Sequence, residues 1–165
     1  MNKYILTIAL GVLAFITTSF SKNTVVPTKN IDYTNTKKAH FAGGCFWGVE
    51  HLFEKQKGVK DVVSGFMGGH VQNPSYRAVI KGDTGHVETV EVVYDSSEIS
   101  YESLAKLFFE IHDSTQKNGQ GPDIGSQYLS VVFYENEEEK RTSEKLIEIL
   151  KAKGTFFVPQ IPSVV

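Results

Sequence analysis

Cys45 is the residue of this sequence best suited to nucleophilic chemistry. It is the sole cysteine and lies in the stretch 43–50, Gly-Gly-Cys-Phe-Trp-Gly-Val-Glu, where glycines mark a turn from a strand into a helix. A cysteine at a helix start faces unpaired backbone N–H groups and the positive end of the helix dipole. That setting favours the thiolate and can lower the thiol pKa from about 8.5 to roughly 3.5–7.5. A lone cysteine is more often a small buried apolar residue, but the turn and the aromatic neighbours favour a thiolate nucleophile here.

Glu88 is a carboxyl group that could hold a proton near neutral pH. It has the same strand parity as Val90, Val92 and Tyr94, so it would project from the apolar face of its strand. Loss of hydration there would raise its pKa. The alternative is a strand-end carboxylate turned to solvent. His86, two residues earlier, could orient Glu88 or simply lie at a turn.

Other histidines suggest a competing chemistry, in which an imidazole acts as base for Cys45 in an acyl-transferring or peptidase-like enzyme. The candidates are His40, His51, His70 and His112, and nothing in their spacing supports the pairing. None stands in an HExxH or similar ligand spacing either, so we expect no metal. A third reading is a non-catalytic module that binds peptides through an aromatic patch.

Short elements must position these residues. Period-2 patterns predict strands at residues 39–42, 59–66, 87–94 and 127–134, with a further strand at 156–158. Helices are predicted after the Cys45 turn, ending at Gly58, after a Ser100 cap, and after an Asn136 cap, ending at Gly154. The segments 70–85 and 112–126 are predicted to be long loops, which in compact domains are usually functional.

The order strand, helix, strand, strand, helix, strand, helix predicts an α+β fold. We expect a two-layer sandwich with a mainly antiparallel sheet, a split βαβ (ferredoxin-like) core and helices packed on it. The two long loops and the Cys45 turn could then converge at one edge of the sheet.

Composition is that of one ordinary globular domain. The 165 residues are 41% hydrophobic and 22% charged, enough for a sizeable core. The net charge of −2 and a pI near 6.2 give no general attraction to nucleic acid or to an anionic membrane. A single cysteine excludes an intrachain disulfide and a cysteine-rich metal site within this sequence.

The first residues resemble an export signal. Lys3 precedes an apolar run at 4–16, and Ser19-Phe20-Ser21 offers small residues at a cleavage site. We therefore expect a signal peptide at 1–21, with an uncleaved membrane anchor as the alternative, and export to the periplasm or cell envelope of a bacterium. The polar segment 22–37 is expected to be a flexible linker, and 38–165 the folded domain.

Four segments in order carry a resemblance to a known family: GCFWGVE, NPSYR, GDTGHVE and GPDIGSQY. Together they resemble the A-type peptide methionine sulfoxide reductases, over about residues 40–153. The resemblance implies thiol-dependent reduction of the S-epimer of methionine sulfoxide, free or in proteins, to methionine. Such a reaction requires a soft nucleophile at sulfur and a proton donor at oxygen.

The resemblance also implies roles for particular residues. Cys45 matches the nucleophile, which would become a sulfenic acid. Glu88 matches the proton donor, and Tyr76 and Tyr128 match two tyrosines that hydrogen-bond the sulfoxide oxygen. Asp123 matches a residue that helps hold the water and oxygen network of the site.

The pocket for the substrate methyl group is matched by Phe46 and Trp47. As bare sequence features, these rings could equally be core aromatics. They could also be the patch by which a non-catalytic module binds oxidised-methionine peptides. The family implies no bound cofactor. It implies as partners a methionine sulfoxide substrate and an external thiol reductant, either a thioredoxin-like protein or a small thiol; we further expect a monomer that binds no nucleic acid.

This sequence departs from the family near its C-terminus. Many members continue with a Y-H-Q-containing segment and one or two resolving cysteines, and this sequence contains neither. We therefore expect a domain that is short at the C-terminus. We also expect the sulfenic acid of Cys45 to be attacked directly by an external thiol.

Overall fold

The computed structural model describes residues 33–154, which form an α+β domain. The strands of the main sheet are β1 (Thr36–Gly43), β2 (Val59–Met67), β3 (Val87–Asp95) and β6 (Ser130–Phe133). The helices are α1 (Phe46–Phe53), α2 (Tyr76–Ile80), α3 (Tyr101–Ile111) and α4 (Glu137–Ala152). A hairpin of β4 (Gly119–Gln120) and β5 (Asp123–Ile124) precedes the short 3-10 helix η1 (Ser126–Tyr128).

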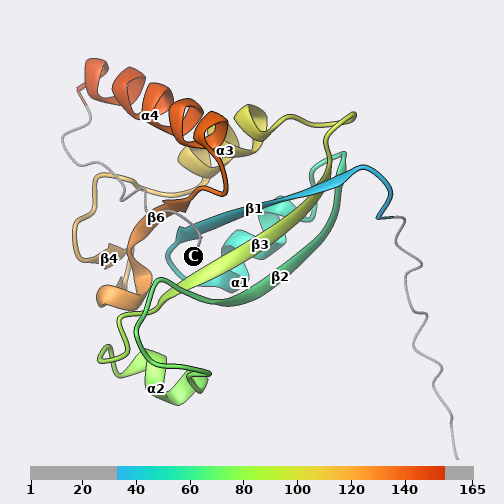
Figure 1. Cartoon of the computed structure of the whole chain (residues 1–165). Coiled ribbons are helices and arrows are strands. Elements are labelled where there is room, and N and C mark those ends of the chain that lie inside the picture. Colours follow the sequence, from blue (N-terminus) through green and yellow to red (C-terminus); the bar gives the residue numbers. More distant parts are fainter. Residues whose placement is uncertain (1–32, 155–165) are drawn as a thin grey trace, which may run out of the picture. The chain divides into compact units, whose positions relative to one another are not determined.

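The main sheet has the strand order β2-β3-β1-β6, and every pairing in it is antiparallel. Strands β1 and β2 are therefore parallel to each other, with β3 between them and α1 in the connection (Figure 1). Strands β3 and β6 form a second such unit around β1, with α3 in the connection. Two interleaved βαβ units make the ferredoxin-like arrangement, so the predicted fold class is confirmed.

The principal core lies between one face of the sheet and α1 and α3, with α4 packed against α3. Phe41 of β1 is fully buried and stacks on Phe53 and Phe108, at ring-centroid distances of 5.3 and 5.1 Å. Val90 and Val92 of β3 belong to the same core. The parity argument therefore places Glu88 correctly, since its exposed fraction is only 2%.

Helix caps agree with the sequence at two positions. The Ser100 hydroxyl accepts a hydrogen bond from the backbone of Ser103, and the Asn136 side chain accepts from Glu138 and Glu139. These bonds satisfy backbone N–H groups that a helix start leaves unpaired.

The two segments predicted to be loops contain a short helix and a short hairpin that the sequence patterns did not predict. Residues 70–85 include α2, whose start is capped by Ser75, and residues 112–126 include the β4–β5 hairpin. The strand predicted over 127–134 is wrong at its start, because Gln127 and Tyr128 lie in η1 and the strand begins at Ser130. A five-residue helix and two-residue strands are too short for periodicity to detect.

Two element boundaries also differ from the prediction. Strand β1 begins at Thr36, so the last two residues of the expected linker belong to it. Helix α1 ends at Phe53, five residues before the predicted stop at Gly58, which follows a turn. The expected signal peptide, most of the linker and the predicted strand at 156–158 lie outside the described residues.

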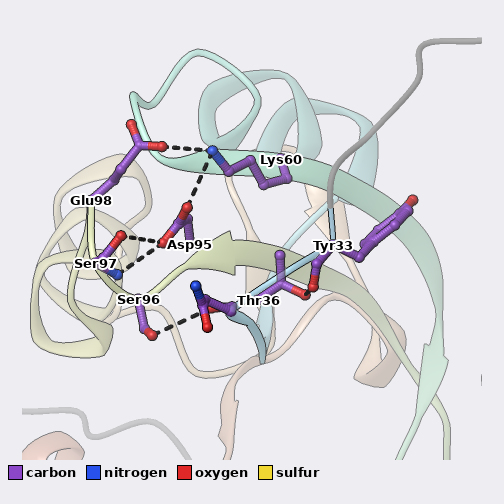
Figure 2. Close-up of polar contacts among 8 residues, drawn as sticks. Tyr33, Thr36, Lys60, Asp95, Ser96, Ser97 and Glu98 are labelled. Carbon is purple, nitrogen blue, oxygen red and sulfur yellow. Dashed lines mark hydrogen bonds and ion pairs between the residues drawn. The ribbon is translucent and has the colours of Figure 1, made fainter.

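At the end of the sheet opposite the Cys45 turn, polar contacts join the chain around Asp95 (Figure 2). Lys60 Nζ lies 2.6 Å from Glu98 Oε1 and 3.5 Å from Asp95 Oδ2. The Ser97 hydroxyl donates to Asp95 Oδ1 at 2.6 Å. Ion pairs and hydrogen bonds therefore connect the chain segments at this end of the sheet. In the described part of the chain, no helix is long and apolar enough to cross a membrane.

Candidate active site

Cys45 stands at the N-cap position of α1, directly after strand β1, and is half-buried. The turn before it requires glycine, because Gly44 has φ +94° and a Cβ there would lie 2.6 Å from Cβ of Gln120. The Cys45 side chain makes no capping hydrogen bond, so the first N–H groups of α1 are left for other acceptors.

Glu88 accepts from one of those N–H groups. The backbone N–H of Phe46 donates to Glu88 Oε2 at 3.1 Å, within a buried environment. Burial raises the pKa of the Glu88 carboxyl, the hydrogen bond from Phe46 opposes that rise, and the charge of Asp123 adds to it. The net result is a raised pKa, so the structure keeps a protonatable carboxyl one residue away from the cysteine.

Tyr128 and Asp123 are the remaining polar residues of the candidate site. Burial is the largest cause of the raised pKa of the Tyr128 phenol, followed by the charge of Glu88, with smaller contributions from Tyr76 and Asp123. A phenol with a raised pKa remains a hydrogen-bond donor at neutral pH.

An aromatic cluster forms the apolar side. Phe46 is buried and its ring centroid lies 5.9 Å from that of Trp47, 5.7 Å from that of Phe66 and 6.3 Å from that of Tyr76. Trp47 is 66% exposed, so it is no core residue and can face a ligand. Ring contacts and one hydrogen bond therefore join Trp47, Tyr76 and Glu88 to Phe46, the residue after Cys45. Tyr128 and Asp123 are linked to Glu88 only through the effect of their charges.

Phe66 is a member of this cluster that the sequence reading missed. It pairs directly with Glu88 across strands β2 and β3, and its ring packs on Phe46 and Tyr76. Its strand parity with Val62, a core residue, could have placed it on the same face. Its partner, however, depends on the register between two strands that are far apart in sequence.

The loops around the site are tied to the Cys45 turn, as the predicted convergence requires. Gln120 covers Gly44 and makes two hydrogen bonds of 3.0 Å with the backbone N–H and carbonyl of Asp113. On the other side, the Ser126 hydroxyl donates to the Gly82 carbonyl at 3.4 Å. Both predicted loops therefore contribute to the same edge of the sheet.

Three of the histidines have side-chain partners other than Cys45. His40 contacts Glu91, and His112 contacts the Ser130 hydroxyl and the Phe108 carbonyl. Burial lowers the pKa of His112. His86 contacts the Val71 carbonyl at 2.8 Å and the Gly69 N–H, so it binds the loop before α2 rather than orienting Glu88.

Among residues 33–154, no hydrogen bond joins an imidazole to Cys45, and the cysteine–histidine alternative has no support there. The same residues contain no cluster of three or more His, Cys, Asp or Glu side chains that could hold a metal ion. What the site does offer is a half-buried thiol, a carboxyl group of raised pKa, two phenols and an apolar wall.

Comparison with known proteins gives a consistent result. A family model described as peptide methionine sulfoxide reductase matches residues 37–164. The peptide methionine sulfoxide reductase MsrA of Natronomonas pharaonis is 49% identical over 121 residues, which are 73% of this chain and 68% of that relative. This chain thus spans about two thirds of the relative's length.

Solved structures agree with these matches. Methionine sulfoxide reductase A of Corynebacterium diphtheriae has a TM-score of 0.69 and 34% identity, covering 78% of this chain and 65% of that one. Reduced Mxr1 from Saccharomyces cerevisiae has a TM-score of 0.73 and 32% identity, covering 82% and 80%. A structure of Mxr1 in complex with Trx2 also shares the fold, with a TM-score of 0.54 and 23% identity, covering 84% and 81%.

Proposed function

The chain belongs to the peptide methionine sulfoxide reductase family, and on this premise we propose that it reduces methionine S-sulfoxide, free or in proteins, to methionine. The observation that carries the proposal is the hydrogen bond from the Phe46 N–H to Glu88. It ties a buried carboxyl of raised pKa to the residue after the only cysteine of the sequence. Nucleophile and acid are the two groups that sulfoxide reduction requires.

In the proposed reaction, the Cys45 thiolate attacks the sulfoxide sulfur while Glu88 gives its proton to the sulfoxide oxygen. The attack forms a bond between the two sulfur atoms, and the protonated oxygen leaves the substrate sulfur. Return of this oxygen, as hydroxide or water, to the Cys45 sulfur breaks the sulfur–sulfur bond, releases methionine and leaves Cys45 as a sulfenic acid. The substrate sulfur gains two electrons and the cysteine sulfur loses two. Tyr76 and Tyr128 donate hydrogen bonds to the oxygen as its negative charge develops, and Asp123 helps to hold the hydrogen-bond network of the site.

The aromatic cluster would determine which substituent of the sulfoxide sulfur packs against it. Phe46, Trp47 and Phe66 supply apolar surface next to Cys45, and Glu88 and the two phenols supply the polar groups. A methyl group fits the apolar surface and the polar sulfur–oxygen bond fits the polar groups. Discrimination between the epimers follows, since the two epimers exchange these groups, and the S-epimer is the one that the family resemblance implies.

An external thiol would restore the enzyme. The 165 residues contain one cysteine, so none of them can form a disulfide with Cys45. A first thiol would form a mixed disulfide and release water, and a second thiolate would then free Cys45 and leave the reductant oxidised. A thioredoxin-like protein is one candidate, in keeping with the Trx2 complex of yeast Mxr1, and a small thiol is the other.

We place this reaction outside the cytoplasm, in the periplasm or cell envelope of a bacterium, as a repair of oxidised proteins. The support is the predicted signal peptide at 1–21. Fractionation of cells that produce the full chain checks it: we expect a processed protein in the periplasmic fraction, and an unprocessed protein in the cytosol would contradict it.

Turnover of separated epimers tests the activity. We expect wild type with dithiothreitol to reduce methionine S-sulfoxide and to leave the R-epimer unchanged, and Cys45→Ser to reduce neither. No turnover by wild type, or equal turnover by both proteins, would remove the assignment. Ester hydrolysis without sulfoxide reduction would favour a cysteine hydrolase, and binding of an oxidised peptide without product would favour a recognition module.

The intact mass after one turnover without reductant tests the external thiol. A gain of one oxygen on Cys45 is expected. A disulfide-linked homodimer would instead mean that a second copy of the chain supplies the resolving thiol.

A further inference from the structure

Gln127 has a buried polar group that the proposed reaction does not use. Its side chain is 6% exposed, and its Oε1 is buried without a hydrogen-bond partner among the described residues. A buried acceptor without a donor costs free energy that an apolar side chain of similar size would avoid. The glutamine therefore calls for an explanation other than core packing.

The other atom of this amide joins two segments of the site. Gln127 Nε2 donates to the Ile80 carbonyl at 3.3 Å, across a sequence separation of 47 residues. Ile80 is the last residue of α2, the helix that begins with Tyr76, and Gln127 directly precedes Tyr128. The Gln127 side chain thus links α2, which carries Tyr76, to η1, which carries Tyr128.

The backbone around Gln127 is shaped to admit its side chain. Gly125 has φ +149°, and a Cβ at that residue would lie 2.4 Å from Gln127 Oε1. The nearby Ser126 hydroxyl donates a hydrogen bond to the Gly82 carbonyl, and this bond is a second link between the same two segments. The amide consequently lies folded between η1 and the end of α2.

Tyr76 is held by ring contacts, by the fully buried Val79 of its own helix and by the bonds at the end of that helix. It is 46% exposed and begins a helix of five residues, and its ring contacts Phe46 and Phe66. A helix this short has marginal stability of its own, so its position depends on tertiary contacts. The Gln127 bond at its far end is such a contact.

We propose that Gln127 is a positioning residue that holds Tyr76 and Tyr128 at a fixed separation around the sulfoxide oxygen, by bonding α2 to the turn that carries Tyr128. This inference rests on the proposed function. Gln127 also lowers the pKa of the Tyr128 phenol against the larger effect of burial. A shift of the two phenols of the order of 1 Å could cost up to about a hundredfold in rate.

The test is a double-mutant cycle on S-sulfoxide turnover. Gln127→Met, which keeps the volume and removes the amide, should lower kcat by about tenfold or more. In a background that carries both Tyr76→Phe and Tyr128→Phe, the same change should alter kcat by less than about twofold, because both hydroxyls that it positions are absent. A tenfold loss in both backgrounds would overturn the proposal.

Gln56 supplies a matched control, since its Nε2 likewise donates to a backbone carbonyl, that of Leu52 at 3.2 Å. Gln56→Met should leave kcat unchanged. Gln127→Glu, which keeps the shape and replaces the donating amide group, should lose as much activity as Gln127→Met. Wild-type activity in Gln127→Glu would contradict the role of the donor.

A readout without substrate separates this inference from the proposed function. With tyrosine labelled by ¹³C at Cζ, and with the Tyr128 signal assigned by Tyr128→Phe, Gln127→Met should raise the pKa of Tyr128 even if the chain has no reductase activity. An unchanged Tyr128 titration would overturn the positioning role. A raised pKa in a protein that fails to reduce sulfoxide would contradict only the proposed function.

Discussion

Strand β3 carries a carboxyl group near each end, and the surroundings of the two differ. Glu88, beside the Cys45 turn, is buried and receives one backbone N–H, and its pKa is raised. Asp95, at the opposite end, accepts from the Ser97 hydroxyl and N–H and pairs with Lys60, and its pKa is lowered (Figure 2). The strand therefore places a protonatable acid at one end and a fixed anion at the other.

A third carboxyl, that of Glu91 in the middle of the strand, shows whether burial or a nearby cation decides the direction of the pKa shift. Burial acts to raise the pKa of Glu91, yet Lys38 at 2.8 Å and His40 at 3.1 Å hold its net pKa below the ordinary value. No ion pair of the described residues involves Glu88. A nearby cation outweighs burial, so a proton donor requires a site from which cations are kept away.

The strongest test of this comparison removes each carboxyl in turn. Glu88→Gln keeps the shape and loses the transferable proton, so we expect kcat for S-sulfoxide to fall by about 10²–10⁴-fold. Glu91→Gln, on the opposite face, should leave kcat within about twofold. Steady-state kinetics with dithiothreitol measures both, and alkylation of Cys45 should be largely intact in Glu88→Gln. Unchanged turnover would exclude Glu88 from the mechanism.

Two glycines provide the next test, one at each end of the sheet. Gly44 and Gly58 have φ of +94° and +93°, and a Cβ would lie 2.6 Å from Gln120 Cβ in the first case and 2.8 Å from Ile99 Cγ2 in the second. Each change to alanine should therefore lower the free energy of unfolding by about 1–3 kcal/mol in denaturant titrations. Only Gly44→Ala should also lower kcat/KM, because it displaces Gln120 from the Cys45 turn. Equal activity in the two variants would contradict this.

Helix caps extend the comparison with a smaller effect. Ser75 caps α2 and Ser100 caps α3, each by accepting a backbone N–H. Loss of either hydroxyl in Ser75→Ala or Ser100→Ala should weaken the helix by about 1 kcal/mol. Because α2 begins with Tyr76, Ser75→Ala should also raise KM or lower kcat severalfold, whereas Ser100→Ala should change only the thermal midpoint. A kinetic defect in Ser100→Ala would argue that the two ends of the sheet are coupled.

The pH dependence of stability should have opposite signs at Glu88 and Glu91. With its raised pKa, Glu88 contributes stability below its unfolded pKa and loses this contribution as pH rises through the folded pKa. The thermal midpoint of Glu88→Gln should therefore increase relative to that of wild type as pH rises. With its lowered pKa, Glu91 contributes above its unfolded pKa and loses this as pH falls through the folded one, so Glu91→Gln should approach wild type in acid. Thermal midpoints at several pH values measure both, and parallel curves would contradict the assignment.

Much of this site could be predicted from local sequence patterns. The glycines before Cys45 indicated the turn into α1, and the period of two along β3 put Glu88 on the core face. Ser100 and Asn136 marked two helix starts correctly. Such signals succeed because turn chemistry, strand alternation and capping involve residues within about four positions of one another.

Other features of the site depend on contacts between distant residues. Tyr128 was expected in a strand, but its segment forms η1, in which Gln127 can reach Ile80. Phe66 joins the aromatic cluster because β2 pairs with β3 in a register that places it opposite Glu88. Neither contact has a periodic signature in the sequence.

The sequence by itself determined the reactive groups of this protein: one thiol at a helix start, one carboxyl on an apolar face, and two tyrosines in glycine-bearing segments. Only the tertiary structure decided that the carboxyl bonds to the Phe46 N–H, with no ion pair to another described residue, and that one amide ties α2 to the Tyr128 turn. The physical reason is that residue type sets which proton or electron pair a group can offer. Strand register and loop packing set its neighbours, its hydration and hence its pKa.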